Sequence, residues 1–257
     1  MGLGDDLMAT GHIRGLQVKD PRKVRIEYGK PLWSEVFDNN PRIARPEERG
    51  DFQVYRPRGR NGLRPYIASK SAQRWTWQDH EPPVGELYFT DAELEFARKI
   101  GPVDVVLEPG IKAKASPNKQ WGEKRWAALV ALLRSSGIEL VQFGRTQFAM
   151  PRVRPIFTET FRMAAAVLRN ARGAVLHEGG LHHAAAAVGT RAVVLYGGYI
   201  SPRQTGYNLH TNLFTGGEPC GRRFPCAHCA QAMAKITPEM VLEEIKRICR
   251  ESTTART

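Results

Sequence analysis

The second half of the chain alternates short apolar runs with helical patterns, and this alternation restricts the fold more than any other feature. Strands are expected at residues 104–108, 138–143, 174–176 and 191–196, with helices at 124–135 and 161–170, over the alanine run after His183, and after Thr237. Strands that alternate with helices of this length form a parallel sheet with right-handed crossovers and helices on both faces. The sequence therefore predicts an α/β fold that binds its ligand at the carboxyl ends of the strands.

The first half has a weaker pattern. Strands are expected at residues 24–28 and 52–55, a short helix at 32–37 and a longer helix at 91–99. The tripeptide Ile100-Gly101-Pro102 then interrupts the pattern. We therefore predict two domains, residues 1–101 and residues 102–257.

Charge restricts the class of partner. The 257 residues carry a formal net charge of +12, with a pI near 9.8, which favours a polyanion such as nucleic acid, anionic lipid or a phosphorylated glycan. No run reaches the roughly 18–20 apolar residues that a membrane-spanning helix needs, and the N-terminus does not read as a signal peptide. We expect a cytoplasmic protein with no transmembrane segment.

The segment HEGGLHH lies between a predicted strand and a predicted helix, at the binding edge of the sheet. Gly179 and Gly180 let the backbone approach a ligand, and the free N–H groups of the helix that follows suit a phosphate. Glu178 cannot bind phosphate, but it can accept hydrogen bonds from sugar hydroxyls. The alternative is a tight turn in which Glu178 caps the helix and both histidines lie on the surface.

Two further segments carry candidate ligand-binding residues. Ser116 and Lys119, in SPNKQW, follow the strand at 104–108, so Lys119 could reach phosphates at the same edge. The chain opens with MGLGDD, a glycine-rich turn into a helix that contains Gly4 and Asp5. A solvated lysine and an ordinary turn are the alternatives.

A basic, aromatic stretch spans residues 55–77. Its arginines could grip phosphates and its tryptophans could stack on bases, although a solvated loop with buried tryptophans explains the same pattern. The candidate acceptor-binding residues are Arg56, Arg58, Arg60, Arg64, Trp75 and Trp77.

The cysteines follow the pattern C-x5-C-x2-C at Cys220, Cys226 and Cys229. This spacing permits a structural zinc site with Cys249 or a histidine as the fourth ligand, but it lacks two separated C-x2-C pairs. We favour reduced thiols and predict no catalytic metal.

These motifs together resemble glycosyltransferase family 9, whose familiar members are the ADP-heptose:lipopolysaccharide heptosyltransferases. The resemblance rests on GLGDDLMATG, SPNKQWGEKRW, EGGLHHAAAAVGT with VVLYGG, and PCGRRFPCAHC leading into ITPEMV. It implies a GT-B fold, in which two Rossmann-like domains face each other across a cleft and the C-terminal domain holds most of a nucleotide-sugar donor. The N-terminal domain is expected to be reduced, since the chain is shorter than the usual family length and lacks the usual first strand.

The resemblance also implies roles for single residues. Asp5 matches the family's general base, with Gly4 beside the reacting sugar, and Lys119 matches a lysine that contacts donor phosphate. The loop at residues 178–183 matches the family's donor loop, so Glu178 would hold sugar hydroxyls, Gly179 and Gly180 would face the diphosphate, and His183 would lie near the nucleotide. Glu178 stands where the family usually has Asp, and Gly179 where it has Thr. The sugar could therefore differ from heptose.

The expected activity is transfer of a sugar from a nucleotide-diphosphate donor to a hydroxyl group, with inversion and without a cofactor or metal. The favoured acceptor is the lipopolysaccharide core or a related glycan, which would involve peripheral membrane contact. One alternative is a DNA glycosyltransferase acting on a hydroxymethylated pyrimidine. Another is an inactive transferase fold that binds nucleic acid, against which Asp5 and Lys119 argue.

Overall fold

The computed structural model describes residues 2–59, 62–112, 115–144 and 149–254. Its largest element is a six-stranded parallel sheet in the order β10-β9-β8-β5-β6-β7. Starting from β5, which comes first in the sequence, the chain adds β6 and β7 on one side and then β8, β9 and β10 on the other. This is the strand order of a Rossmann fold. The strands are β5 (Val103–Leu107), β6 (Leu140–Phe143), β7 (Arg154–Ile156), β8 (Ala171–His177), β9 (Ala192–Tyr196) and β10 (Thr211–Phe214).

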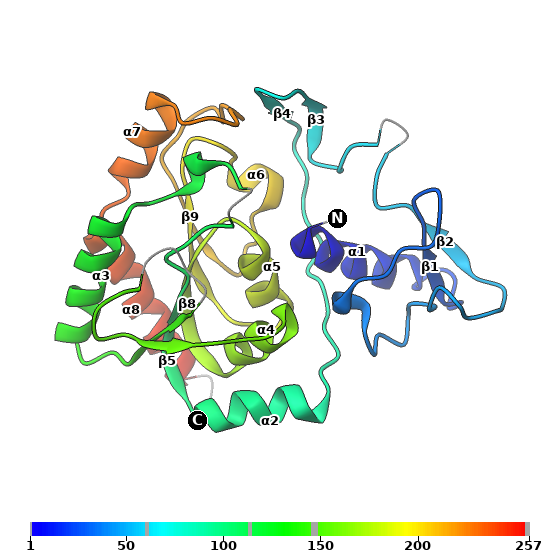
Figure 1. The fold of residues 1–257 in the computed structure, drawn as a ribbon, viewed down its shortest axis with the longest axis horizontal. Coiled ribbons are helices and arrows are strands. Elements are labelled where there is room, and N and C mark those ends of the chain that lie inside the picture. The colour runs from blue at the N-terminus through cyan, green and yellow to red at the C-terminus, as the bar shows by residue number, and fades with distance from the viewer. Residues whose placement is uncertain (1, 60–61, 113–114, 145–148, 255–257) are drawn as a thin grey trace.

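Helices cover both faces of this sheet (Figure 1). On one face, α3 (Glu123–Ser135) and α8 (Pro238–Thr254) pack on side chains such as Val105 and Leu107. On the other face, α4 (Phe161–Asn170) and α5 (Gly180–Ala187) pack on the alternate side chains, such as Val106. The side chains of neighbouring residues in one strand are thus buried on opposite faces of the sheet, as the two-residue period of a strand requires.

The N-terminal half contains small sheets only, in the part of the chain that the structure describes. β1 (Val24–Ile26) and β2 (Gln53–Tyr55) form a parallel pair, and β3 (Ile67–Lys70) and β4 (Trp75–Trp77) form an antiparallel pair. This half also contains a short helical turn, η1 (Glu35–Phe37). The remaining elements belong to the second half of the chain: the short helical turns η2 (Pro117–Lys119) and α6 (Pro202–Thr205), and the helix α7 (Ala227–Lys235), which precedes α8.

Two helices join the halves. α1 (Leu3–Leu16) packs against α5, and α2 (Asp91–Ile100) packs against α4 (Figure 1). On α4, Arg162 is 3% exposed; its Nε lies 2.6 Å from Glu93 Oε1, and it also donates to the Glu35 carbonyl. Buried side chains of both halves form one cluster, so the N-terminal half shares its core with the large sheet.

The α/β fold with a parallel sheet is confirmed, and the expected strands and helices of the second half are all present. The sequence patterns did not indicate β7, β10, α7 or the β3–β4 hairpin, and the helix expected at 32–37 is a single turn, η1. The boundary between residues 101 and 102 stays a prediction. None of the described helices is both long enough and apolar enough to cross a membrane.

Candidate active site

A cavity of about 280 Å³ lies where β5 and β8 end, at the point where the strand order reverses. Open α/β sheets bind ligands at this switch point. Every donor-site residue predicted from the sequence lines the cavity together with the predicted catalytic residue: Gly4, Asp5, Ser116, Lys119, Glu178, Gly179, Gly180 and His183. Segments far apart in the sequence thus meet at one place.

Asp5 reaches the cavity from the first turn of α1, and three donors hold its carboxylate. The Gly2 N–H donates to Oδ2 over 3.0 Å, the Tyr66 hydroxyl donates to Oδ1 over 2.8 Å, and Arg64 Nε lies 3.1 Å from Oδ2. Burial and the Asp5 charge raise the pKa of Tyr66 well above its usual value, so this hydroxyl stays protonated and donates a hydrogen bond to the carboxylate. The carboxylate retains lone pairs for a ligand hydroxyl.

Lys119 and Glu178, which both line the cavity, form an ion pair. Their side chains are 19% and 8% exposed, and Thr205 Oγ1 lies 3.4 Å from the second carboxylate oxygen. Burial tends to raise the pKa of Glu178, but the attraction of the Lys119 ammonium outweighs it and the pKa lies below its usual value. The pair is therefore ionised, and the ammonium can also approach an anionic ligand.

His182 fixes the glycine loop. Its Nδ1 accepts from the Gly179 N–H over 2.9 Å, so Nε2 carries the proton that is donated to the Thr205 carbonyl over 2.8 Å. Burial lowers the pKa of His182, which keeps the ring neutral in this tautomer. Both ring nitrogens are thus engaged, although His182 lies close to Glu178 and His183 in a group of metal-binding residue types.

His183 contacts α1 at a point where only glycine fits. It is 4% exposed, its Nδ1 lies 2.7 Å from the Tyr207 hydroxyl, and its Cδ2 would lie 2.5 Å from a Cβ atom added to Gly4. Burial lowers the pKa of His183 well below its usual value. The alternative of surface histidines is therefore wrong, since both are buried.

Ser116 lies beside the loop that carries the cysteines. Its Oγ donates to the Arg222 carbonyl over 3.1 Å, and Asn118 Nδ2 donates to the same carbonyl over 2.8 Å. Both side chains are buried, so they fix the position of Lys119 on η2 relative to this loop.

The predicted acceptor residues divide into two groups. Arg64, Trp75 and Trp77 line the cavity, whereas Arg56 and Arg58 are not among its lining residues. Arg58 instead donates to the Gly62 carbonyl over 3.0 Å and lies over the ring of Tyr28. Arg60 lies outside the described residues.

Other residues of the cavity were not singled out from the sequence: Glu108, Lys112, Tyr199 and Arg223. Glu108 follows β5 as Glu178 follows β8, so the same strand-end argument could have found it. Burial raises the pKa of Glu108 to about 8, although Lys112 and Lys119 act in the opposite direction. The carboxyl group is thus mostly protonated near neutral pH.

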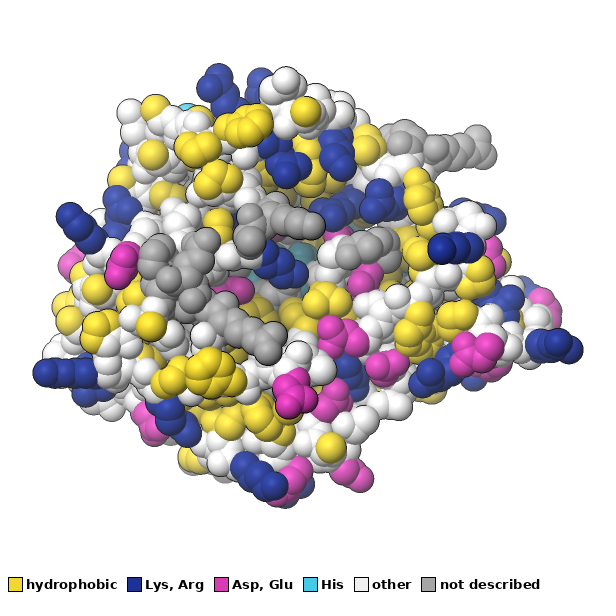
Figure 2. All heavy atoms as spheres, in the orientation of Figure 1, with side chains coloured by type: hydrophobic (Ala, Val, Ile, Leu, Met, Phe, Trp, Pro, Cys, Tyr) yellow, Lys and Arg dark blue, Asp and Glu magenta, His cyan; other side chains and the backbone are white. Residues whose placement is uncertain are grey.

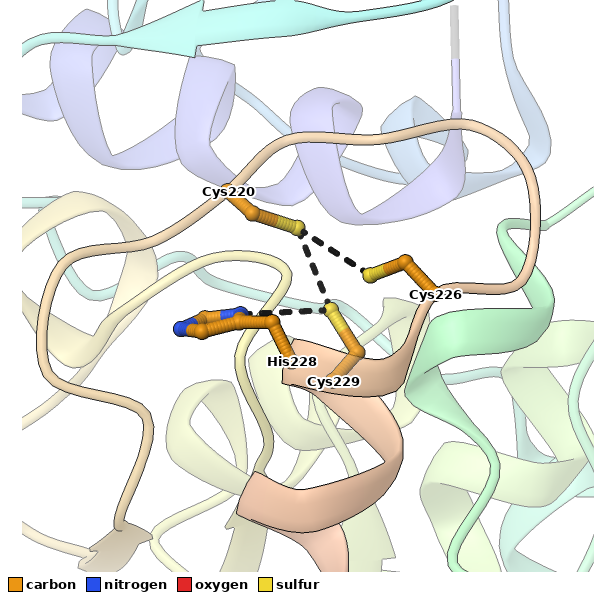
Figure 3. A group of neighbouring side chains, drawn as sticks. All are labelled: Cys220, Cys226, His228 and Cys229. Atoms are coloured by element: carbon orange, nitrogen blue, oxygen red, sulfur yellow. Dashed lines mark hydrogen bonds between the residues drawn. The ribbon is translucent and has the colours of Figure 1, made fainter.

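Three of the cysteines come together in a group that is not among the lining residues of the cavity. Cys220, Cys226 and Cys229 lie close to one another and to His228, and cysteine and histidine side chains can bind a metal ion (Figure 3). Cys249 lies on α8 and is not part of the group, so of the two fourth ligands considered from the sequence the structure favours a histidine.

Comparisons with known proteins relate the chain to one family. The model of glycosyltransferase family 9 (heptosyltransferase) matches residues 90–233, which is more than half of the chain. Among curated proteins, a sequence search finds no significant match.

Solved structures resemble this fold at low sequence identity. An ADP-heptose lps heptosyltransferase II from E. coli is 21% identical with a TM-score of 0.52; the match covers 68% of this chain and 56% of that protein. A glycosyl transferase family 9 from Veillonella parvula DSM 2008 is 14% identical with a TM-score of 0.64, over 98% of this chain and 95% of that one. The iron-containing dodecameric glycosyltransferase TibC from enterotoxigenic E. coli H10407 is 15% identical with a TM-score of 0.61, over 98% and 74%.

Proposed function

The chain belongs to glycosyltransferase family 9, and we propose that it transfers a sugar from a nucleotide-diphosphate donor to a hydroxyl group of a polyanionic acceptor. One observation carries the proposal: the carboxylate of Asp5, on α1, faces the same cavity as Lys119 and the glycine loop of β8 and α5. A base and a phosphate site in one cavity are what a direct displacement needs.

The proposed reaction is a single displacement at the anomeric carbon. An acceptor oxygen attacks this carbon as Asp5 takes its proton, the bond between the sugar and the diphosphate breaks, and the nucleoside diphosphate leaves. General-base catalysis of this kind contributes roughly 10²- to 10⁴-fold. Attack on the side opposite the leaving group inverts the configuration.

The leaving group gains negative charge as its bond breaks. Lys119 and the first N–H groups of α5 would stabilise this charge, because Lys119, Gly179 and Gly180 all line the cavity and α5 begins at Gly180. Glu178 would bind the sugar hydroxyls with the carboxylate lone pairs that Lys119 leaves available.

The acceptor is expected to be anionic because of the charge around the cavity. Lys112, Lys119 and Arg223 line it, and further Lys and Arg side chains gather along the upper edge of the hollow in Figure 2. The E. coli relative is named as acting on lipopolysaccharide, and a phosphorylated glycan core fits this charge. The tryptophans fit a flipped base less well, because Trp77 stacks on Tyr66 and donates to the Tyr199 carbonyl over 2.9 Å.

The test is a transfer assay with a panel of nucleotide-sugars and two acceptors, lipopolysaccharide core and DNA containing 5-hydroxymethylpyrimidines. We expect transfer to the glycan, and a loss of at least 10²-fold in kcat for Asp5→Asn with the fold retained by circular dichroism. Transfer to DNA alone would show that the acceptor is DNA and would refute the proposed glycan acceptor. An Asp5→Asn variant with unchanged turnover would refute the proposed mechanism.

A further inference from the structure

Four side chains around the loop at residues 216–229 have the spacing of metal ligands. Cys220 Sγ lies 3.8 Å from Cys226 Sγ and 3.2 Å from Cys229 Sγ, and His228 Nδ1 lies 3.9 Å from Cys229 Sγ (Figure 3). All four candidate ligand atoms lie within 4.8 Å of one another. A tetrahedral zinc site, with Zn–S near 2.3 Å and Zn–N near 2.0 Å, places its ligand atoms roughly 3.5–3.8 Å apart.

The histidine has the tautomer that a ligand needs. His228 Nε2 lies 2.9 Å from the Gly216 carbonyl, which only accepts, so Nε2 carries the proton and Nδ1 presents its lone pair toward Cys229. Metal-binding histidines are usually oriented by a bond of this kind from the other ring nitrogen. The ring also lies against Gly198, where an added Cβ would be 2.5 Å from Nδ1.

The backbone holds the ligands in place. The Cys220 N–H donates to the Gly198 carbonyl over 2.8 Å, the Cys226 N–H donates to Asn118 Oδ1 over 3.1 Å, and the Arg222 N–H points at Cys220 Sγ over 3.4 Å. The separation of 3.2 Å between Cys220 and Cys229 is well beyond the roughly 2.05 Å of a disulfide bond.

We propose that Cys220, Cys226, Cys229 and His228 bind one tetrahedral metal ion of the zinc class, and that this ion fastens the loop over the donor cavity. Three thiols lose their protons to solvent when the ion binds. Three thiolates and Zn²⁺ leave a charge of −1, which the adjacent Arg222 and Arg223 offset.

The loop connects the metal site to the cavity, and this part of the inference rests on the proposed function. The Gly221 carbonyl accepts from the Trp75 N–H over 3.0 Å, and the guanidinium of Arg223 lies 4.8 Å from the ring centre of Trp75. Both Trp75 and Arg223 line the cavity. Loss of the ion would therefore release two residues that line the cavity.

The first experiment measures metal in the protein of 257 residues. Elemental analysis after purification without chelator should give one zinc per chain, and replacement by Co²⁺ should give the visible bands of tetrahedral Co²⁺ with thiolate charge transfer. Cys226→Ser and His228→Ala should lose the ion, whereas the matched control Cys249→Ser, which lies outside the cluster, should keep it. The Co²⁺ spectrum of the unsubstituted protein tests the site even if a variant fails to fold.

Two results would overturn the metal site: a protein that contains no metal and takes up no Co²⁺, or a disulfide between Cys220 and Cys229 in the unreduced protein. The second experiment measures the Kd of ADP and UDP before and after chelation. A weaker Kd after chelation supports the link to the cavity, and an unchanged Kd refutes that link. Absence of nucleotide binding in the metal-loaded protein would count against the proposed function, independently of the metal content.

Discussion

The contact between Gly4 and His183 makes the strongest prediction about this site. Gly4→Ala would place a Cβ 2.5 Å from His183 Cδ2, about 1 Å closer than an ordinary contact. His183 cannot give way cheaply, because it is 4% exposed and its Nδ1 is bonded to the Tyr207 hydroxyl. The N-terminal turn of α1, with Asp5, must therefore move away from α5.

Two magnitudes follow from this displacement. Overpacking of this kind costs about 1–3 kcal/mol of unfolding free energy. A shift of about 1 Å in a catalytic group lowers the rate on the order of 10²-fold. We therefore expect Gly4→Ala to lower both stability in urea and kcat, and to change kcat more than donor affinity.

The same helix provides the control. An added Cβ at Gly15 meets nothing within 4 Å, so Gly15→Ala should stabilise α1 by up to about 1 kcal/mol and leave kcat unchanged. Both variants are compared by urea unfolding and by the transfer assay. A Gly4→Ala protein as active and as stable as the original would refute the proposal that this contact sets the position of Asp5.

Three further predictions concern charged groups. Lys119→Met leaves the carboxylate of Glu178 buried without its partner and should lower the unfolding free energy by about 3–5 kcal/mol. The double variant Lys119→Met/Glu178→Gln should restore most of this loss, and equal unfolding free energies for the single and the double variant would contradict the prediction. The pKa of Glu108 is raised to about 8, so its ionisation above that pH adds negative charge to the cavity. Nucleotide binding, measured by calorimetric titration, should therefore be about tenfold weaker at pH 9 than at pH 7, and Glu108→Gln should abolish this difference. Burial raises the pKa of Asp6 to about 6 from 3.8, so the folded state favours the protonated form and stability falls as the pH rises from about 4 to 6. Asp6→Asn should therefore raise the unfolding free energy by up to about 3 kcal/mol at pH 8 and by nothing below pH 4. A difference in unfolding free energy that does not depend on pH would refute this prediction.

The sequence by itself determined the class of fold and located the segments that line the cavity. The alternation of strands and helices specified a parallel sheet because hydrophobic periodicity is local, and strand ends mark the binding edge. Motifs of consecutive residues, such as Glu178-Gly179-Gly180, could be located because one strand-to-helix loop carries them. The edge strands β7 (Arg154–Ile156) and β10 (Thr211–Phe214) escaped because half or more of their residues are polar or proline, which leaves no apolar run to recognise.

Only the tertiary structure decided which distant residues act together. It paired Arg64 with Asp5 across 3.1 Å, although the sequence suggested that this arginine binds phosphate. It placed Trp77 in the cavity wall, and it left Cys249 outside the group that Cys220, Cys226, His228 and Cys229 form. Such pairings depend on how loops from both halves pack against one sheet edge, and a contact between residues far apart in the chain leaves no mark in the local pattern of either segment.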